Sequence, residues 1–185
     1  QQWGLQSPGQ SLTFGRMIAD SRTSVAFTGH RTYRGAAADA LRRTVGELYA
    51  RGFRNFLSGM AVGFDLAAAE AVLELRERAP GVRLVAAVPF RGQEMRFSPA
   101  DRERFRRVLA EADSVEVLAP AYHRGCYAVR NDFLVDNARV LVAWYDGSPG
   151  GTRYTVRRAL GRGLEVVNLC PAAPVPPAPE PTLFG

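Results

Sequence analysis

The chain has 185 residues, 46% of them hydrophobic, and a formal net charge of +6. This length and composition indicate one domain with a single sizeable core, and the longest apolar runs are far shorter than the roughly 20 residues that cross a bilayer. We therefore expect a cytoplasmic protein with no membrane partner. The excess of positive charge favours an anionic ligand over a cationic one.

All 24 basic residues are arginine. A guanidinium grips phosphate in a bidentate manner, so this bias fits a phosphate or nucleic-acid partner, but a GC-rich coding sequence would produce the same bias. The two cysteines, Cys126 and Cys170, have no partner at metal-ligand spacing and indicate reduced thiols. The sequence implies no metal and leaves any cofactor unknown.

Short β-branched or aromatic runs alternate along the chain with longer runs of helical periodicity, which is typical of a parallel sheet with crossover helices. We predict an α/β fold: a Rossmann-like three-layer sandwich with a mostly parallel sheet of about six strands. The expected strands lie near 24–28, 54–58, 82–88, 114–118, 140–145 and 164–169. The expected helices lie near 36–51, 64–79, 98–109, 124–138 and 151–162.

The two ends of the chain differ in composition from its middle. Residues 1–22 have few periodic apolar positions and are expected to form a flexible leader. Residues 171–185 begin with six prolines in eleven residues, which argues against a helix or a central strand and predicts an extended tail. The Rossmann-like domain is expected to cover residues 23–170.

Four glycine-bearing turns each follow a predicted strand. They are Thr28 to Arg31, Ser58 to Asp65, Pro89 to Gly92 and Asp146 to Thr152. Turns that leave the carboxyl ends of parallel strands share one edge of the sheet, and ligands bind at that edge. The four turns therefore predict one site.

Two of these turns open directly into predicted helices. Backbone N–H groups at a helix start bind phosphate or carboxylate, and we expect this of Gly59 and Gly63 in one turn and of Gly150, Gly151 and the Thr152 hydroxyl in the other. A turn that merely connects strand to helix has the same pattern, so the two interpretations stay open.

Three polar groups near these turns have equally balanced interpretations. Asp65 either caps the helix dipole or accepts a hydrogen bond from a ribose hydroxyl. His30 could act in acid–base chemistry, and Arg31 could bind an anion. No carboxylate lies near His30 in the sequence, so hydrogen bonds that stabilise the loop are an equally good explanation of both residues. Arg124, Tyr127 and Asn131 recur at spacings of three and four on a predicted helix that also carries Arg130, and this face points either to the site or to solvent.

Several motifs occur in order over residues 24 to 170. They are Phe27 to Arg31, Ser58 to Asp65 with Ala68 to Glu70, Val88 to Phe90 with Gln93, Tyr127 with Arg130, Asn131 and Asp136, and Tyr145 to Gly147 with Gly150 to Thr152. Together they resemble the YpsA-like proteins of the SLOG superfamily, which also holds the DprA DNA-processing proteins and the LOG phosphoribohydrolases. The resemblance implies that the strand-end loops hold a nucleotide or nucleotide-derived ligand. The residues expected to contact it are Thr28, Gly29, His30, Arg31, Gly59, Met60, Gly63, Phe64, Asp65, Pro89, Phe90, Arg130, Asn131, Asp146, Gly150, Gly151 and Thr152.

The resemblance also limits the expected function. LOG enzymes use a Pro-Gly-Gly-x-Gly-Thr-x-x-Glu pattern, and this chain keeps the glycines after Pro149 but lacks the catalytic glutamate. We therefore expect a sensor or regulatory module that binds a nucleotide or nucleotide-sugar. One alternative is a nucleotide hydrolase or phosphoribohydrolase in which Asp65, Glu70 or Asp146 replaces that glutamate; another is DprA-like binding of single-stranded DNA. The sequence does not identify the ligand, a catalytic residue or a homo-oligomer.

Overall fold

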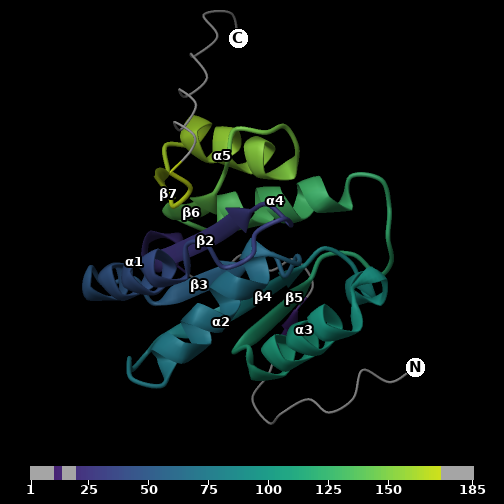
Figure 1. The fold of residues 1–185 in the computed structure, drawn as a ribbon. Coiled ribbons are helices and arrows are strands. Elements are labelled where there is room, and N and C mark those ends of the chain that lie inside the picture. The colour runs from purple at the N-terminus through teal and green to yellow at the C-terminus, as the bar shows by residue number, and fades with distance from the viewer. Residues whose placement is uncertain (1–10, 14–19, 172–185) are drawn as a thin grey trace, which may run out of the picture.

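The computed structural model describes residues 11–13 and 20–171 of the chain (Figure 1). Its sheet is seven-stranded and entirely parallel, in the order β1-β5-β4-β3-β2-β6-β7. The strands are β1 (Ser11–Thr13), β2 (Ser24–Gly29), β3 (Asn55–Ser58), β4 (Arg83–Val88), β5 (Ser114–Val117), β6 (Val140–Trp144) and β7 (Glu165–Asn168). The predicted fold class is confirmed, and the six predicted strands are present.

The additional strand, β1, lies inside the segment that we expected to be a leader. It pairs with β5 in parallel, with Ser11 opposite Ser114 and Thr13 opposite Glu116. The remainder of that segment up to residue 19 and the proline-rich stretch after Pro171 lie outside the described residues. The domain boundaries therefore stay a prediction.

Helices cover both faces of the sheet, as a three-layer sandwich requires (Figure 1). They are α1 (Ala38–Ala50), α2 (Phe64–Arg76), α3 (Pro99–Glu111), α4 (Cys126–Asp136) and α5 (Gly151–Gly161), with the short 3-10 turns η1 (Ser21–Thr23) and η2 (Gln93–Arg96). One apolar cluster joins α1, α2 and α3 to the sheet, and a second joins α4 and α5 to its opposite face.

The central strand β2 shows why this sequence builds two cores. Val25 and Phe27 point into the cluster with α1 and α2, whereas Ala26, one residue out of phase, belongs to the cluster with α4 and α5. All three side chains are fully buried. Because successive side chains of a strand alternate between faces, a continuous apolar run is what a strand covered on both sides needs.

The direction of chain winding changes at β2. From β2 the chain moves outward through β3, β4 and β5 and then returns to place β6 and β7 on the other side of β2. The backbone N–H of His30 donates to the carbonyl of Trp144 at 3.3 Å, just past the end of the β2–β6 ladder. Ligands of open α/β sheets bind at such a switch point, so the β2–α1 and β6–α5 loops occupy the position where a site is expected.

Among the described residues, none of the helices has the length and apolar character that crossing a membrane requires. The five α-helices contain 11 to 13 residues each.

Gly29 ends β2 where the strand meets the start of α2. A Cβ at this position would lie 2.4 Å from Cβ of Phe64, which is fully buried. We expect Gly29→Ala to lower the free energy of unfolding by about 1–3 kcal/mol, because an inserted methyl group forces a packed core apart. Urea denaturation measures the change. Gly46→Ala in α1 is the control: nothing lies within 4 Å of the added methyl, and alanine in a helix stabilises by up to about 1 kcal/mol. Equal stability of Gly29→Ala and the wild type would contradict this packing.

Candidate functional site

The loops that follow β2, β3, β4 and β6 leave the same edge of the sheet, as expected for parallel strands. All four glycine-bearing turns belong to this edge, which we call the strand-end rim (residues 29–37, 59–63, 89–92 and 145–150). Helix α4 contributes Tyr127, Arg130 and Asn131 to the same region. The rim therefore brings together segments that are more than 100 residues apart in the chain.

The centre of the rim is a buried arginine that lies against Gly59. Arg130, 6% exposed, donates from Nη1 to the Gly59 carbonyl and from Nε to Oδ1 of Asn131 at 2.7 Å. A Cβ on Gly59 would lie 2.8 Å from Cδ of Arg130 and 2.9 Å from Oδ2 of Asp65. Only glycine permits this approach, so the Gly59 position serves close packing of the Arg130 side chain.

The turn between β3 and α2 has fewer free amides than we expected of a phosphate cradle. The N–H of Met60 donates to Oγ of Ser58 at 3.2 Å, and the N–H of Ala61 donates to Oδ2 of Asp65 at 3.3 Å. The N–H of Phe64 donates to the His30 carbonyl at 3.4 Å. These three donors are already used within the protein, and a binding role for this turn stays a prediction.

Gly63 allows the β3–α2 turn to pack closely against the β2–α1 loop. Its φ is +81°, and a Cβ there would lie 2.7 Å from the carbonyl oxygens of both His30 and Arg31. The β3–α2 turn is thus packed directly on the β2–α1 loop. This contact holds the His30–Arg31 segment in place at the switch point.

Asp65 is a buried carboxylate with spare hydrogen-bonding capacity. It is 4% exposed; Oδ2 accepts from Ala61, whereas Oδ1 has no partner among the described residues. Burial raises the pKa of Asp65 to about 6, against the attraction of Arg130, the Ala61 hydrogen bond and the attraction of Arg31. Burial likewise lowers the pKa of Arg130, which Asp65 partly offsets. Because Oδ1 has no access to solvent, its missing partner is a desolvation cost of the folded structure.

The amino end of α5 is the open counterpart of the β3–α2 turn. Its N-cap, Gly150, has φ +134° with no atom within 4 Å of a built Cβ, and no side chain caps the helix. A Cβ on Gly151 would meet only Nδ2 of Asn131, at 3.6 Å. The first amides of the helix have no side-chain acceptor, and the Thr155 hydroxyl donates to the Gly151 carbonyl at 2.8 Å. These amides and the helix dipole suit an anion.

The structure places the Asp146 carboxylate beside His30. The sequence did not predict this contact, because the two residues are 116 positions apart. Nε2 of His30 lies 2.8 Å from Oδ1 of Asp146 and 3.2 Å from the Asp146 backbone nitrogen. A protonated Nε2 donates to the carboxylate, and an unprotonated one accepts from the amide. Ser148 donates to Oδ1 of Asp146 from its hydroxyl at 2.5 Å and from its backbone at 2.9 Å, and these bonds lower the pKa of Asp146. The pair therefore links the two loops of the switch point.

Aromatic rings line the rim beyond the Gly59 turn. Phe90, which follows β4, is 5.9 Å from Tyr127 between ring centroids, and the guanidinium of Arg31 lies 5.2 Å above the Tyr127 ring. Tyr122, which the sequence analysis did not single out, completes the group at 5.5 Å from Phe90. No recognisable motif surrounds Tyr122, so only the fold reveals it.

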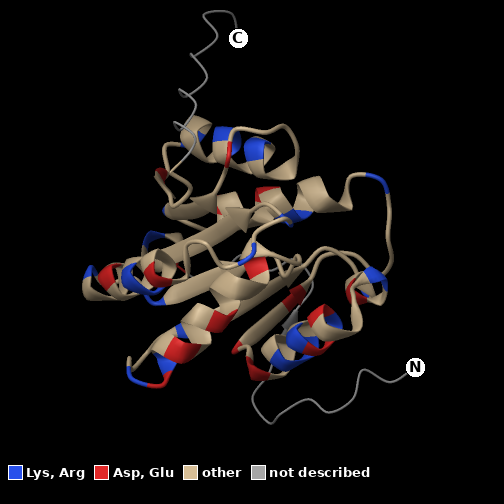
Figure 2. Cartoon of the chain, viewed as in Figure 1, with Lys and Arg blue, Asp and Glu red and all other residues tan. Residues whose placement is uncertain are grey.

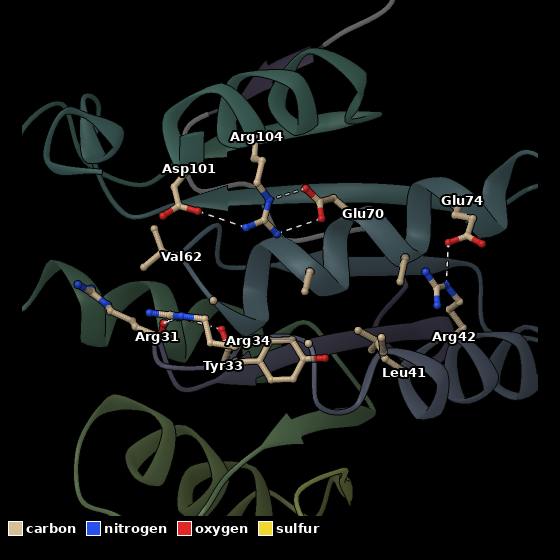
Figure 3. A pocket seen from close by; sticks show the side chains of 15 residues that line it. Arg31, Tyr33, Arg34, Leu41, Arg42, Val62, Glu70, Glu74, Asp101 and Arg104 are labelled. Atoms are coloured by element: carbon tan, nitrogen blue, oxygen red, sulfur yellow. Dashed lines mark hydrogen bonds and ion pairs between the residues drawn. The ribbon is translucent and has the colours of Figure 1, made fainter. Parts of the chain in front are cut away.

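A cavity of about 580 Å³ opens beside the rim, between α1, α2 and the start of α3. Figure 3 shows Arg31 and Arg34 on one wall and Asp101 and Arg104 on the other. Arg104 binds both oxygens of Glu70, at 2.8 and 3.0 Å. Glu70 is therefore held in an ion pair at the wall of this cavity, and its role in place of the missing glutamate stays untested.

Charge is distributed unevenly over the helices. Acidic and basic residues are mixed along α1 and α3, whereas α5 carries arginines and no acidic residue (Figure 2). Among the described residues, no group of three or more His, Cys, Asp and Glu side chains gathers in a way that could hold a metal ion.

Taken together, the fold and the rim define a Rossmann-like protein with the motif order of the SLOG superfamily. The model of the YpsA family, described as the YspA SLOG family, matches residues 26–163. This chain belongs to that family.

Similar proteins and structures agree with this assignment. The UPF0398 protein of Bacillus thuringiensis (strain Al Hakam) is 29% identical over 132 residues, 70% of this chain and 71% of that protein. The UPF0398 protein of Bacillus cereus (strain G9842) is 28% identical over 137 residues, 72% and 74% of the two chains.

Two solved structures of the DNA processing protein DprA share the fold. The Streptococcus pneumoniae protein has a TM-score of 0.58 at 21% identity and the Helicobacter pylori protein 0.57 at 18%. Each match covers 77% of this chain, but 48% and 63% of the respective DprA chains. The structure of the H. pylori protein describes its single-stranded DNA binding mode.

The buried carboxylate predicts a pH dependence of stability. Because the pKa of Asp65 is raised from 3.8 to about 6 in the folded protein, the folded state binds a proton between these pH values that the unfolded state does not. The contribution of Asp65 is therefore most favourable below pH 4 and falls by on the order of 3 kcal/mol as the pH rises to about 6.

Urea denaturation between pH 4 and pH 8 tests this dependence against Asp65→Asn, which does not titrate. We expect the wild type to lose stability relative to Asp65→Asn up to about pH 6 and the difference to be constant above it. Asp39→Asn, which removes an exposed carboxylate on α1, controls for the loss of one negative charge. A difference that does not change between pH 4 and pH 7 would show that Asp65 is not desolvated.

Proposed function

We propose that this protein binds a nucleotide or nucleotide-derived ligand at the strand-end rim and acts as a sensor or regulatory module. The observation that carries the proposal is the uncapped, open amino end of α5 at Gly150 and Gly151. It lies next to the switch point of the sheet, where nucleotides bind in comparable folds. Phosphate is the ligand group that these amides suit best.

The charges of the rim support an anionic ligand that also carries hydroxyl groups. Arg31 lies at the rim without a salt bridge to any described residue, so a phosphate there gains a cation without breaking an ion pair. Oδ1 of Asp65 is buried without a partner, and a ribose hydroxyl that entered beside Gly59 by displacing its neighbours would supply one. One nucleotide would satisfy both groups and the α5 amides together.

Thermal unfolding with AMP, ADP-ribose and NAD tests the proposal. A ligand at 100 times its dissociation constant adds about 2.7 kcal/mol of stability, which for a protein of this size raises Tm by roughly 5–10 °C. We expect at least one of these ligands to produce such a shift. We expect Gly151→Val to abolish it, because the side chain would cover the first amides of α5 without backbone strain.

Gly46→Val is the matched control for that variant, since Gly46 is also a helical glycine. It lies in α1, away from the rim, and no atom lies within 4 Å of a Cβ built on it. This variant is expected to keep the full ligand-induced shift. The proposal fails if a broad nucleotide panel leaves Tm unchanged, or if both valine variants respond to the ligand like the wild type.

A second candidate function is binding of single-stranded DNA, and the basic surface of α5 favours it. Arg153 and Arg157 are exposed on this helix and form no salt bridge with described residues. With Gly150, Tyr154 and Arg158 they line a shallow cavity of about 520 Å³. The fold is shared with DprA, one member of which has a described single-stranded DNA binding mode.

If DNA binds there, affinity for an oligonucleotide is expected to fall steeply with salt, because phosphate contacts release counterions. The double variant Arg153→Ala/Arg157→Ala should weaken binding and reduce the salt slope by about two units. The control, Arg42→Ala/Arg51→Ala, removes two arginines already paired with carboxylates. Fluorescence anisotropy from 20 to 300 mM salt measures both, and an absence of binding at the lowest salt excludes this function.

A further inference from the structure

Three aromatic side chains cluster at one end of the strand-end rim: Phe90 after β4, Tyr122 after β5 and Tyr127 on α4. Their centroids lie 5.5 Å (Phe90–Tyr122), 5.9 Å (Phe90–Tyr127) and 6.4 Å (Tyr122–Tyr127) apart. Phe90 is 8% exposed, whereas Tyr122 is 57% exposed. The cluster therefore fixes the Tyr122 ring through edge contacts and leaves more than half of that residue open.

Two cations flank this aromatic cluster. The guanidinium of Arg31 lies 5.2 Å from the Tyr127 ring centroid, and that of Arg96 lies 6.0 Å from the Tyr122 centroid. Neither forms a salt bridge with a described residue. An apolar protein segment docked on Tyr122 would have to bury these charges without partners, whereas a planar base that carries a phosphate would not.

Helix α4 connects the aromatic cluster to the open end of α5. Arg130 and Asn131 lie three and four residues after Tyr127, on the same side of α4. Tyr127 contacts the cluster, Arg130 lies on Gly59, and Asn131 approaches Gly151. One helical turn, about 6 Å, separates Tyr127 from Asn131. In a nucleoside monophosphate, a single ribose separates the base from the phosphate.

We propose that Phe90, Tyr122 and Tyr127 form a base subsite, in which the nucleobase of the ligand stacks on Tyr122 while its phosphate binds at the amino end of α5. This inference rests on the proposed function and narrows it: the ligand is a nucleoside phosphate that retains its base, and a phosphosugar without a base is a poor ligand. Stacking on an exposed, rigidly held tyrosine accepts any base because every base has a π face.

Isothermal titration with AMP and with ribose 5-phosphate tests the subsite, because the two ligands share phosphate and ribose and differ in the base. The wild type is expected to bind AMP roughly tenfold or more tightly than ribose 5-phosphate. Tyr122→Ala should remove most of this preference and leave affinity for ribose 5-phosphate unchanged within about twofold. Tyr122→Phe keeps the ring and should keep the preference, and urea denaturation verifies that both variants are folded.

The outcomes separate the subsite from the proposed function. If the wild type binds AMP and ribose 5-phosphate equally well, or if Tyr122→Ala weakens both ligands to the same extent, the base subsite is wrong and the ligand-binding function stands. If AMP does not bind the wild type, the base subsite is wrong; the proposed function fails with it only if ADP-ribose, NAD and the rest of the nucleotide panel also leave Tm unchanged. Binding of an oligonucleotide that depends on Tyr122, without binding of AMP, would assign the aromatic cluster to DNA instead.

Discussion

A buried guanidinium holds the functional edge of this sheet together. Arg130 comes from α4 on one face, and Asp65 comes from α2 on the opposite face; the two charged side chains flank the missing Cβ of Gly59. Buried charges are tolerated only when they are paired and hydrogen-bonded, and here the Gly59 carbonyl and Asn131 accept from the arginine. The same contacts that satisfy this charge also orient the first turns of α4.

The orientation of α4 has consequences at both ends of the rim. Because Asn131 accepts from Arg130, its amide is held beside Gly151 and the start of α5. Because Tyr127 lies one turn earlier on the same face, its ring is held between Phe90 and the Arg31 guanidinium. Arg130 thus positions the α4 side of the rim, while the packing at Gly63 and the His30–Asp146 pair position its loops.

Local sequence patterns were sufficient to predict the fold, and they were insufficient for the pairings inside the site. Short apolar runs, each followed by a glycine-bearing turn, indicated six strands and their shared edge. A strand that is buried on both faces needs a continuous apolar run, and the chain needs a tight turn where it leaves the strand. Both signals therefore lie within the local sequence of each strand. The β1 strand has only three residues and lies in a polar context, so no such pattern marks it. The contacts of His30 with Asp146 and of Arg130 with Gly59 join residues 116 and 71 positions apart, and they depend on which strands become neighbours.

The β3–α2 and β6–α5 turns show that the same glycine motif can have different hydrogen bonding in the folded protein. Both precede a helix, and both were expected to present free amides. In the β3–α2 turn, Ser58, Asp65 and the His30 carbonyl accept three of those amides. In the β6–α5 turn, Asp146 accepts the amide of Ser148, but no side chain caps the first amides of α5. The difference arises from neighbouring acceptors and not from the glycines. Asp65 in turn keeps one oxygen without a partner, at a desolvation cost that folding alone does not recover. Because Oδ1 of Asp65 has no access to solvent, this cost belongs to the packing of the β3–α2 turn, and the exposed groups of the rim lie instead at the start of α5.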